Sequence, residues 1–190
     1  LKQKFNEKNL KQKISNFFSK MFASGASLSM LILFLIIFVN SLRRYIFGKS
    51  LEWGEELPVY IAIYGVMFGA AWAYMQDRHI RFTMLVGFLS KQQERWLFLL
   101  VDLIMIFTSS LLAYSGWLFV IKRGGMESTG LIGVAKYLQE LCGMDSLIWI
   151  GHFYPYQAAM MIGGVMLALA ALLKMLLRFF ENEAEPSIGV

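Results

Sequence analysis

Long apolar stretches separated by short polar segments dominate the pattern of this chain. Four stretches are long enough to cross a bilayer as helices: residues 17–40, 57–76, 96–121 and 155–178. Each meets the requirement of about 20 predominantly apolar residues for about 30 Å of hydrocarbon. The pattern therefore predicts an all-α integral membrane protein, with four transmembrane helices in a single domain over residues 1–180.

Three shorter segments carry apolar residues on one side and are too short to span, so they predict amphipathic helices at the membrane interface. They are residues 1–16, 80–94 and 130–142. The first 20 residues of the chain combine six Lys with one Glu, which suits a helix lying on anionic lipid. For the acidic tail, residues 181–190, we expect no fixed structure.

A secretory signal peptide is the alternative interpretation of the N-terminal region. Against it, the apolar block from Met21 to Val39 is too long for the apolar core of a signal, and residues 40–43 offer no small-residue cleavage site. We therefore expect this segment to remain in the mature protein.

The distribution of cations predicts the orientation. Twelve Lys and Arg residues flank the four predicted spans on one side and six flank them on the other. Cytoplasmic segments carry the excess of Lys and Arg, so both termini are expected in the cytoplasm.

Composition agrees with a membrane protein, since 57% of the residues are hydrophobic, 16% are charged and the mean hydropathy is +0.55. The net charge of +5 comes from cations beside apolar blocks, which favours membrane lipids as partners and disfavours nucleic acid. One Cys excludes an intrachain disulfide, and with two His it gives too few ligands for a structural zinc site. We expect no metal and no cofactor.

Small residues recur at four-residue spacing inside every predicted span, where they allow helix backbones to approach closely. The pairs and triplet are Gly25 and Ser29, Gly65, Gly69 and Ala73, Ser109 and Ala113, and Gly164 and Ala168. They either hold the four helices together or dock a second membrane protein.

Asp102 is the one acidic residue well inside a predicted span. It lies about six residues, or about 9 Å, from the cytoplasmic end of its helix, which predicts a hydrogen bond at headgroup level. The sequence offers it no intramembrane charge as a partner, which disfavours an ion pathway. Asp102→Asn is therefore expected to leave transport by an assembled complex largely intact.

Catalytic groups do not converge in this sequence. His79 and His152 are expected on opposite membrane faces, about 30 Å apart, so they cannot share one haem. Pro58 and Pro155 begin their spans, where proline does not break a helix, so the paired broken helices of a carrier are missing. We predict no enzyme; a small membrane enzyme or haem protein and an autonomous small carrier remain the alternatives.

The connection between the first two spans carries the most informative residues. Arg44 suits an interfacial anchor, Trp53 and Tyr60 suit an aromatic belt, and Glu55 with Glu56 suits the positive end of the second helix. Such a cluster holds more charge than re-entry into the membrane requires. The two acids are therefore candidates for pairing with cations on a partner.

These residues resemble the small membrane (DctQ-like) subunit of tripartite ATP-independent periplasmic (TRAP) transporters. The matching stretches are Arg44-Tyr45-Ile46-Phe47, Trp53-Gly54-Glu55-Glu56-Leu57, Tyr60, Gly69-Ala70 and His79-Ile80-Arg81. The segment from Glu127 to Tyr154 departs from the family pattern, being longer and more polar.

The resemblance implies a multi-pass protein of the bacterial inner membrane that serves a sodium-driven importer of organic anions, such as sialic acids or C4-dicarboxylates. It implies two protein partners: a large multi-span subunit that carries substrate and sodium as an elevator, and a periplasmic substrate-binding protein. The small subunit would widen the scaffold for the elevator, and its outer loops would help to dock the binding protein. Structural or partner-facing candidates are Arg44, Trp53, Glu55, Glu56, Tyr60, Gly65, Gly69, His79 and Arg81. Of these, His79 and Arg81 are expected to set the cytoplasmic turn.

Overall fold

A computed structural model describes residues 2–76 and 90–182 and is helical throughout its regular parts. Its elements are α1 (Lys2–Phe47), α2 (Trp53–Met75), α4 (Lys91–Arg123), α5 (Leu131–Cys142), the 3-10 helix η1 (Asp145–Gly151) and α6 (Tyr154–Asn182). Four of these helices contain stretches long and apolar enough to cross a membrane: Gln12–Phe47, Trp53–Met75, Gln92–Arg123 and Tyr154–Arg178. The prediction of four helices able to cross a membrane is thus confirmed for the described residues.

The helices extend beyond the apolar segments from which they were predicted, and α1 does so most. Its 46 residues run without a break, so the predicted surface segment 1–16 continues directly into the first span. At 1.5 Å per residue, α1 is about 69 Å long, roughly twice the hydrocarbon thickness. The position of its first turns relative to a membrane surface stays a prediction.

Local sequence explains where the helices begin and end. The Ser90 hydroxyl accepts a hydrogen bond from the Gln93 N–H, and the Gln93 side chain accepts one from the Ser90 N–H, which starts α4 with a capping box. α1 ends at Gly48, whose φ of 70° is left-handed and whose N–H donates to the carbonyl oxygen of Arg44.

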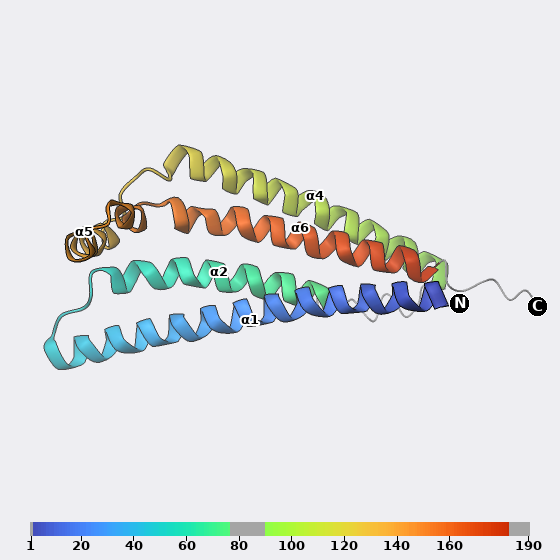
Figure 1. Cartoon of the computed structure of the whole chain (residues 1–190), viewed down its shortest axis with the longest axis horizontal. Helices are drawn as coiled ribbons and strands as arrows, with labels where there is room; N and C mark the ends of the chain where they lie inside the picture. Colours follow the sequence, from blue (N-terminus) through green and yellow to red (C-terminus); the bar gives the residue numbers. More distant parts are fainter. Residues whose placement is uncertain (1, 77–89, 183–190) are drawn as a thin grey trace, which may run out of the picture.

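The four long helices form an open row, in the order α1, α2, α6, α4 (Figure 1). Each packs on its neighbour in that order, and no extensive contact joins α1 to α4 within the described residues. In a closed four-helix bundle every helix has two neighbours, so α1 and α4 are here the free edges of the row. The α6 span is the most buried of the four and the α1 span the least.

The chain starts α1 and ends α6 at the same end of the row, while α5 and η1 lie together at the other end (Figure 1). We call the end with α5 and η1 the outer end and the opposite one the inner end, following the predicted orientation. The orientation itself stays a prediction. Of the predicted interfacial segments, 130–142 coincides with α5, whereas most of 80–94 and the tail from 183 lie outside the described residues.

Close backbone contacts hold neighbouring helices together. A methyl group on Gly164 of α6 would lie 2.4 Å from the backbone nitrogen of Ala113, and one on Gly116 of α4 would lie 2.4 Å from that of Met161. On the other side of the row, a methyl group on Gly25 would lie 2.6 Å from the Phe68 ring. These small residues therefore serve packing within the chain.

Candidate functional site

Glu56 binds the connection between α4 and α5 to the start of α2. Its carboxylate accepts hydrogen bonds from the Ser128 hydroxyl and from the Gly130 N–H, the latter over 3.1 Å. Ser128 is fully buried, and its own N–H donates to the carbonyl oxygen of Gly151. A methyl group on Gly130 would lie 2.6 Å from the carbonyl oxygen of Glu52, so this segment rests directly on the start of α2. Glu56 thus fixes the start of α5 against the second span.

Asn40 sets the level at which α2 begins beside α1. Its amide nitrogen donates to the carbonyl oxygen of Gly54 over 3.3 Å, and its amide oxygen accepts from the Leu51 N–H over 2.7 Å. Gly54 is buried against the same side chain, since a methyl group there would lie 2.6 Å from Asn40. The α1 residues that follow Asn40 therefore project past the start of α2.

Tyr60 lies in the contact between α2 and α6. Its ring stacks on Tyr156 with centroids 4.4 Å apart and meets Phe153 edge-on at 6.1 Å. One turn further along α2, the Tyr64 hydroxyl donates to the carbonyl oxygen of Pro155. The structure thus places Tyr60 in an aromatic contact between helices of this chain.

A buried charged cluster joins three helices towards the inner end. Asp102 of α4 is 0% exposed, and its carboxylate accepts hydrogen bonds from the Tyr74 hydroxyl of α2 and from Arg178 of α6, the latter over 2.8 Å. The Arg178 guanidinium also lies 4.6 Å from the centroid of the Phe98 ring. A carboxylate in a membrane interior is stabilised by such a pair with a cation.

The expectation that Asp102 lacks a charged intramembrane partner is therefore wrong. Arg178 is the last residue of the fourth predicted span, 76 positions away from Asp102 in the sequence. Because α4 and α6 run in opposite directions, the early part of α4 lies beside the late part of α6 (Figure 1). Positions 102 and 178 meet only through that pairing, which periodicity along one helix does not reveal.

The two candidate glycines of α2 differ in their surroundings. Gly65 is buried, and a methyl group there would lie 3.0 Å from the Met30 methyl and 3.2 Å from the Ser29 Cβ. Around Gly69, nothing in the described part of the chain lies within 4 Å of such a methyl group. Gly65 thus serves the contact of α1 with α2, and Gly69 is not required by it.

The remaining candidates lie at the surface or outside the described residues. Arg44 is exposed near the end of α1, Glu55 is exposed in the first turn of α2, and Trp53 is half-buried where α2 begins. Within residues 2–76 and 90–182, the side chains of Arg44 and Glu55 form no hydrogen bond or ion pair. His79 and Arg81 fall outside the described residues. A contact of any of these with a partner stays a prediction.

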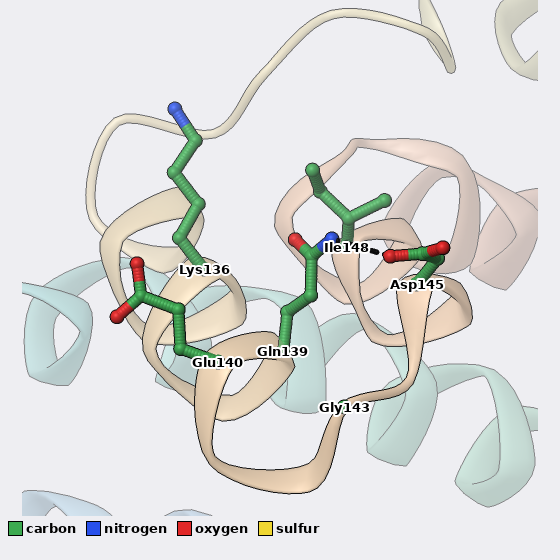
Figure 2. A pocket seen from close by; sticks show the side chains of 6 residues that line it. All are labelled: Lys136, Gln139, Glu140, Gly143, Asp145 and Ile148. Carbon is green, nitrogen blue, oxygen red and sulfur yellow. Dashed lines mark hydrogen bonds between the residues drawn. The ribbon is translucent and has the colours of Figure 1, made fainter.

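An open hollow lies between α5 and η1 at the outer end, lined by Lys136, Gln139, Glu140, Gly143, Asp145 and Ile148 (Figure 2). The Gln139 amide donates to the Asp145 carboxylate over 2.9 Å, which closes one side. One cation beside two acids does not make an anion site. No group of three or more His, Cys, Asp or Glu residues suited to a metal ion is found in the described ranges.

Sequence comparison places these features in a family. Residues 33–181 match the family model described as tripartite ATP-independent periplasmic transporters, DctQ component. Two proteins of Haemophilus influenzae, both described as TRAP transporter small permease proteins, are similar to the chain. One is 26% identical over 84 residues, 44% of this chain and 52% of that protein. The other is 20% identical over 143 residues, 74% of this chain and 87% of that protein. The chain thus matches about half the length of the first relative and most of the second.

Proposed function

This chain belongs to the DctQ family of TRAP transporters, and from that membership we propose that it is a static scaffold beside which its transporter's large membrane subunit moves. As a DctQ component it is a small permease subunit, a multi-pass protein of the bacterial inner membrane and part of a transport system rather than an enzyme. The family also implies a large membrane subunit and a periplasmic binding protein as partners.

The open row of unbroken helices is the observation that carries the scaffold proposal. A row offers two broad faces and two edges to neighbours, whereas a carrier needs a polar path between its helices. Asp102, the fully buried charge of the described spans, binds Arg178 and so ties α4 to α6. This architecture favours a rigid scaffold against which the helices of another subunit pack, and it disfavours an autonomous carrier.

Substrate and sodium belong, on this proposal, to the large subunit. We propose that the assembled transporter imports organic anions, such as sialic acid or C4-dicarboxylates, with sodium. What supports this division is the lack of a convergent anion site in the described residues: the intramembrane Arg178 is engaged by Asp102, and the hollow beside α5 holds two acids against Lys136. The outer surface around α5 is the proposed contact for the binding protein.

Reconstitution separates the scaffold from the autonomous carrier. Proteoliposomes that contain this chain alone, or this chain with the large subunit and the binding protein, are given an inward sodium gradient and a labelled organic anion. We expect uptake only from the complete set. Uptake by this chain alone would establish the carrier instead, and undiminished uptake when only this chain is left out would contradict the scaffold.

A further inference from the structure

We propose that residues 41–49, which are the outer end of α1 and the two residues after it, hold the large membrane subunit through cations and aromatic side chains that this chain leaves uncovered. We call this segment the α1 tip. The inference rests on the proposed function, because it assumes that a large subunit lies beside this chain in the membrane.

The α1 tip projects from the rest of the molecule. Asn40 is bonded to Gly54 at the start of α2, and α1 continues for seven residues beyond it, to Phe47. At 1.5 Å per residue, those residues reach about 10 Å past the start of α2. Figure 1 shows α1 extending beyond α2 at this end before the chain turns back.

Large side chains on the α1 tip are among the most exposed of the molecule. Tyr45 is 91% exposed, Phe47 72% and Ile46 60%, and every residue from 41 to 50 is exposed. Consecutive helical residues point about 100° apart, so these three side chains face different directions. Because the apolar stretch of α1 extends to Phe47, either lipid or a protein pocket has to cover these side chains, and the charges of the tip favour the protein.

Charge specifies the chemistry of the partner. Arg43, Arg44 and Lys49 lie on the tip, and no acidic residue occurs from position 41 to 51. The side chains of these three cations form no ion pair or hydrogen bond with the part of the chain that the structure describes. The matching surface is therefore apolar and carries carboxylates at its rim.

The two edges of the row differ in a way that favours α1 as the docking edge. At the outer end of α4, the chain packs on itself after the helix: Gly124 is buried, and a methyl group there would lie 2.3 Å from the Tyr154 ring, while the Arg123 guanidinium lies 5.8 Å from the centroid of the Phe119 ring. The α1 span is the least buried of the four and leads directly into the uncovered tip. A partner lying along α1 within the bilayer reaches the tip as well, which selects the large membrane subunit as the occupant.

Charge reversal tests the proposal in the complete complex. The Arg43→Glu, Arg44→Glu double variant is co-expressed with the tagged large subunit, and the amount of this chain that co-purifies in mild detergent is compared with its amount in the membrane. We expect co-purification to fall at least about tenfold. The control, Lys122→Glu with Arg123→Glu, makes the same change of charge at the same end of the opposite edge and is expected to co-purify like the wild type.

Photo-crosslinking provides a readout that does not depend on the variant's stability. p-Benzoyl-phenylalanine replaces Tyr45 in one sample and Tyr114, on the exposed side of α4, in another. We expect an adduct with the large subunit from position 45 and none from position 114. Adducts with lipid alone at position 45, or equal losses in the two charge-reversal variants, would overturn the docking of the tip. If the wild-type chain does not co-purify with the large subunit at all, the proposed function itself fails.

Discussion

Asp102 is the residue whose environment most changes the expected effect of a substitution. Asp102→Asn keeps the volume but removes the charge that faces Arg178 within the membrane. Breaking a buried ion pair from one side costs about 3–5 kcal/mol, with less expected here because Arg178 keeps some exposure. We predict a clearly lower thermal unfolding temperature of the purified complex, with unchanged uptake per assembled complex.

A paired replacement controls for simple damage at this site. Asp102→Leu together with Arg178→Met removes both charges, so it should recover much of the stability that Asp102→Leu alone loses. If the double variant is stable but its sodium dependence of uptake is altered, the cluster takes part in ion coupling and is not only a link between helices.

Glu55 and Glu56 are adjacent in sequence but have different surroundings. Glu56→Ala leaves the buried Ser128 hydroxyl and the Gly130 N–H without their acceptor, at a cost of about 1–3 kcal/mol. We predict faster hydrogen exchange and faster proteolysis over residues 128–142. Glu55→Ala, one position away on an exposed site, is the matched control and should leave both rates unchanged. Equal effects of the two variants would contradict the stabilising role of the Glu56 hydrogen bonds.

At the scale of the helices, the contact between α4 and α6 depends on residues without bulk. Gly164→Val places side-chain atoms where the Ala113 backbone lies, so the two helices have to move apart. Overpacking of this kind typically costs about 1–3 kcal/mol. We predict a lower thermal unfolding temperature for this variant, whereas Gly69→Ala, with open space around it, should unfold like the wild type. Similar losses in both would show that the described packing is not what stabilises the pair.

The existence of the four spans could be predicted because each carries its signal within one stretch of apolar residues. Their ends could not, since helices continue through polar residues such as those after Asn40, where composition no longer distinguishes helix from loop. The hydrogen-bonding partners of the charged residues could not be predicted from the sequence either. Glu56 and Asp102 stood out as charges in the sequence, but Ser128 and Arg178 lie 72 and 76 residues further on and meet them only after the helices pair.

At the scale of the whole molecule, the open row has a mechanical consequence. Asn40 links α1 to α2, and Asp102 links α4 to both α2 and α6, so we expect the four helices to move as one body. A body of this kind suits the role of a wall beside moving helices. Its apolar edges are then covered by lipid and by the large subunit, and the membrane-facing residues of α1 are the proposed boundary between them.

A static scaffold does not move relative to the part of the large subunit that it contacts. The most direct measurement is sodium-driven uptake by proteoliposomes in which the two subunits are joined by a reducible disulfide. Cys142→Ser removes the chain's single cysteine, and a new cysteine on exposed α1, such as Leu35→Cys, is paired with one on the large subunit. If this chain is a static scaffold, we expect the cross-linked complex to take up substrate as fast as the reduced one. Uptake that stops on cross-linking and returns on reduction would contradict it.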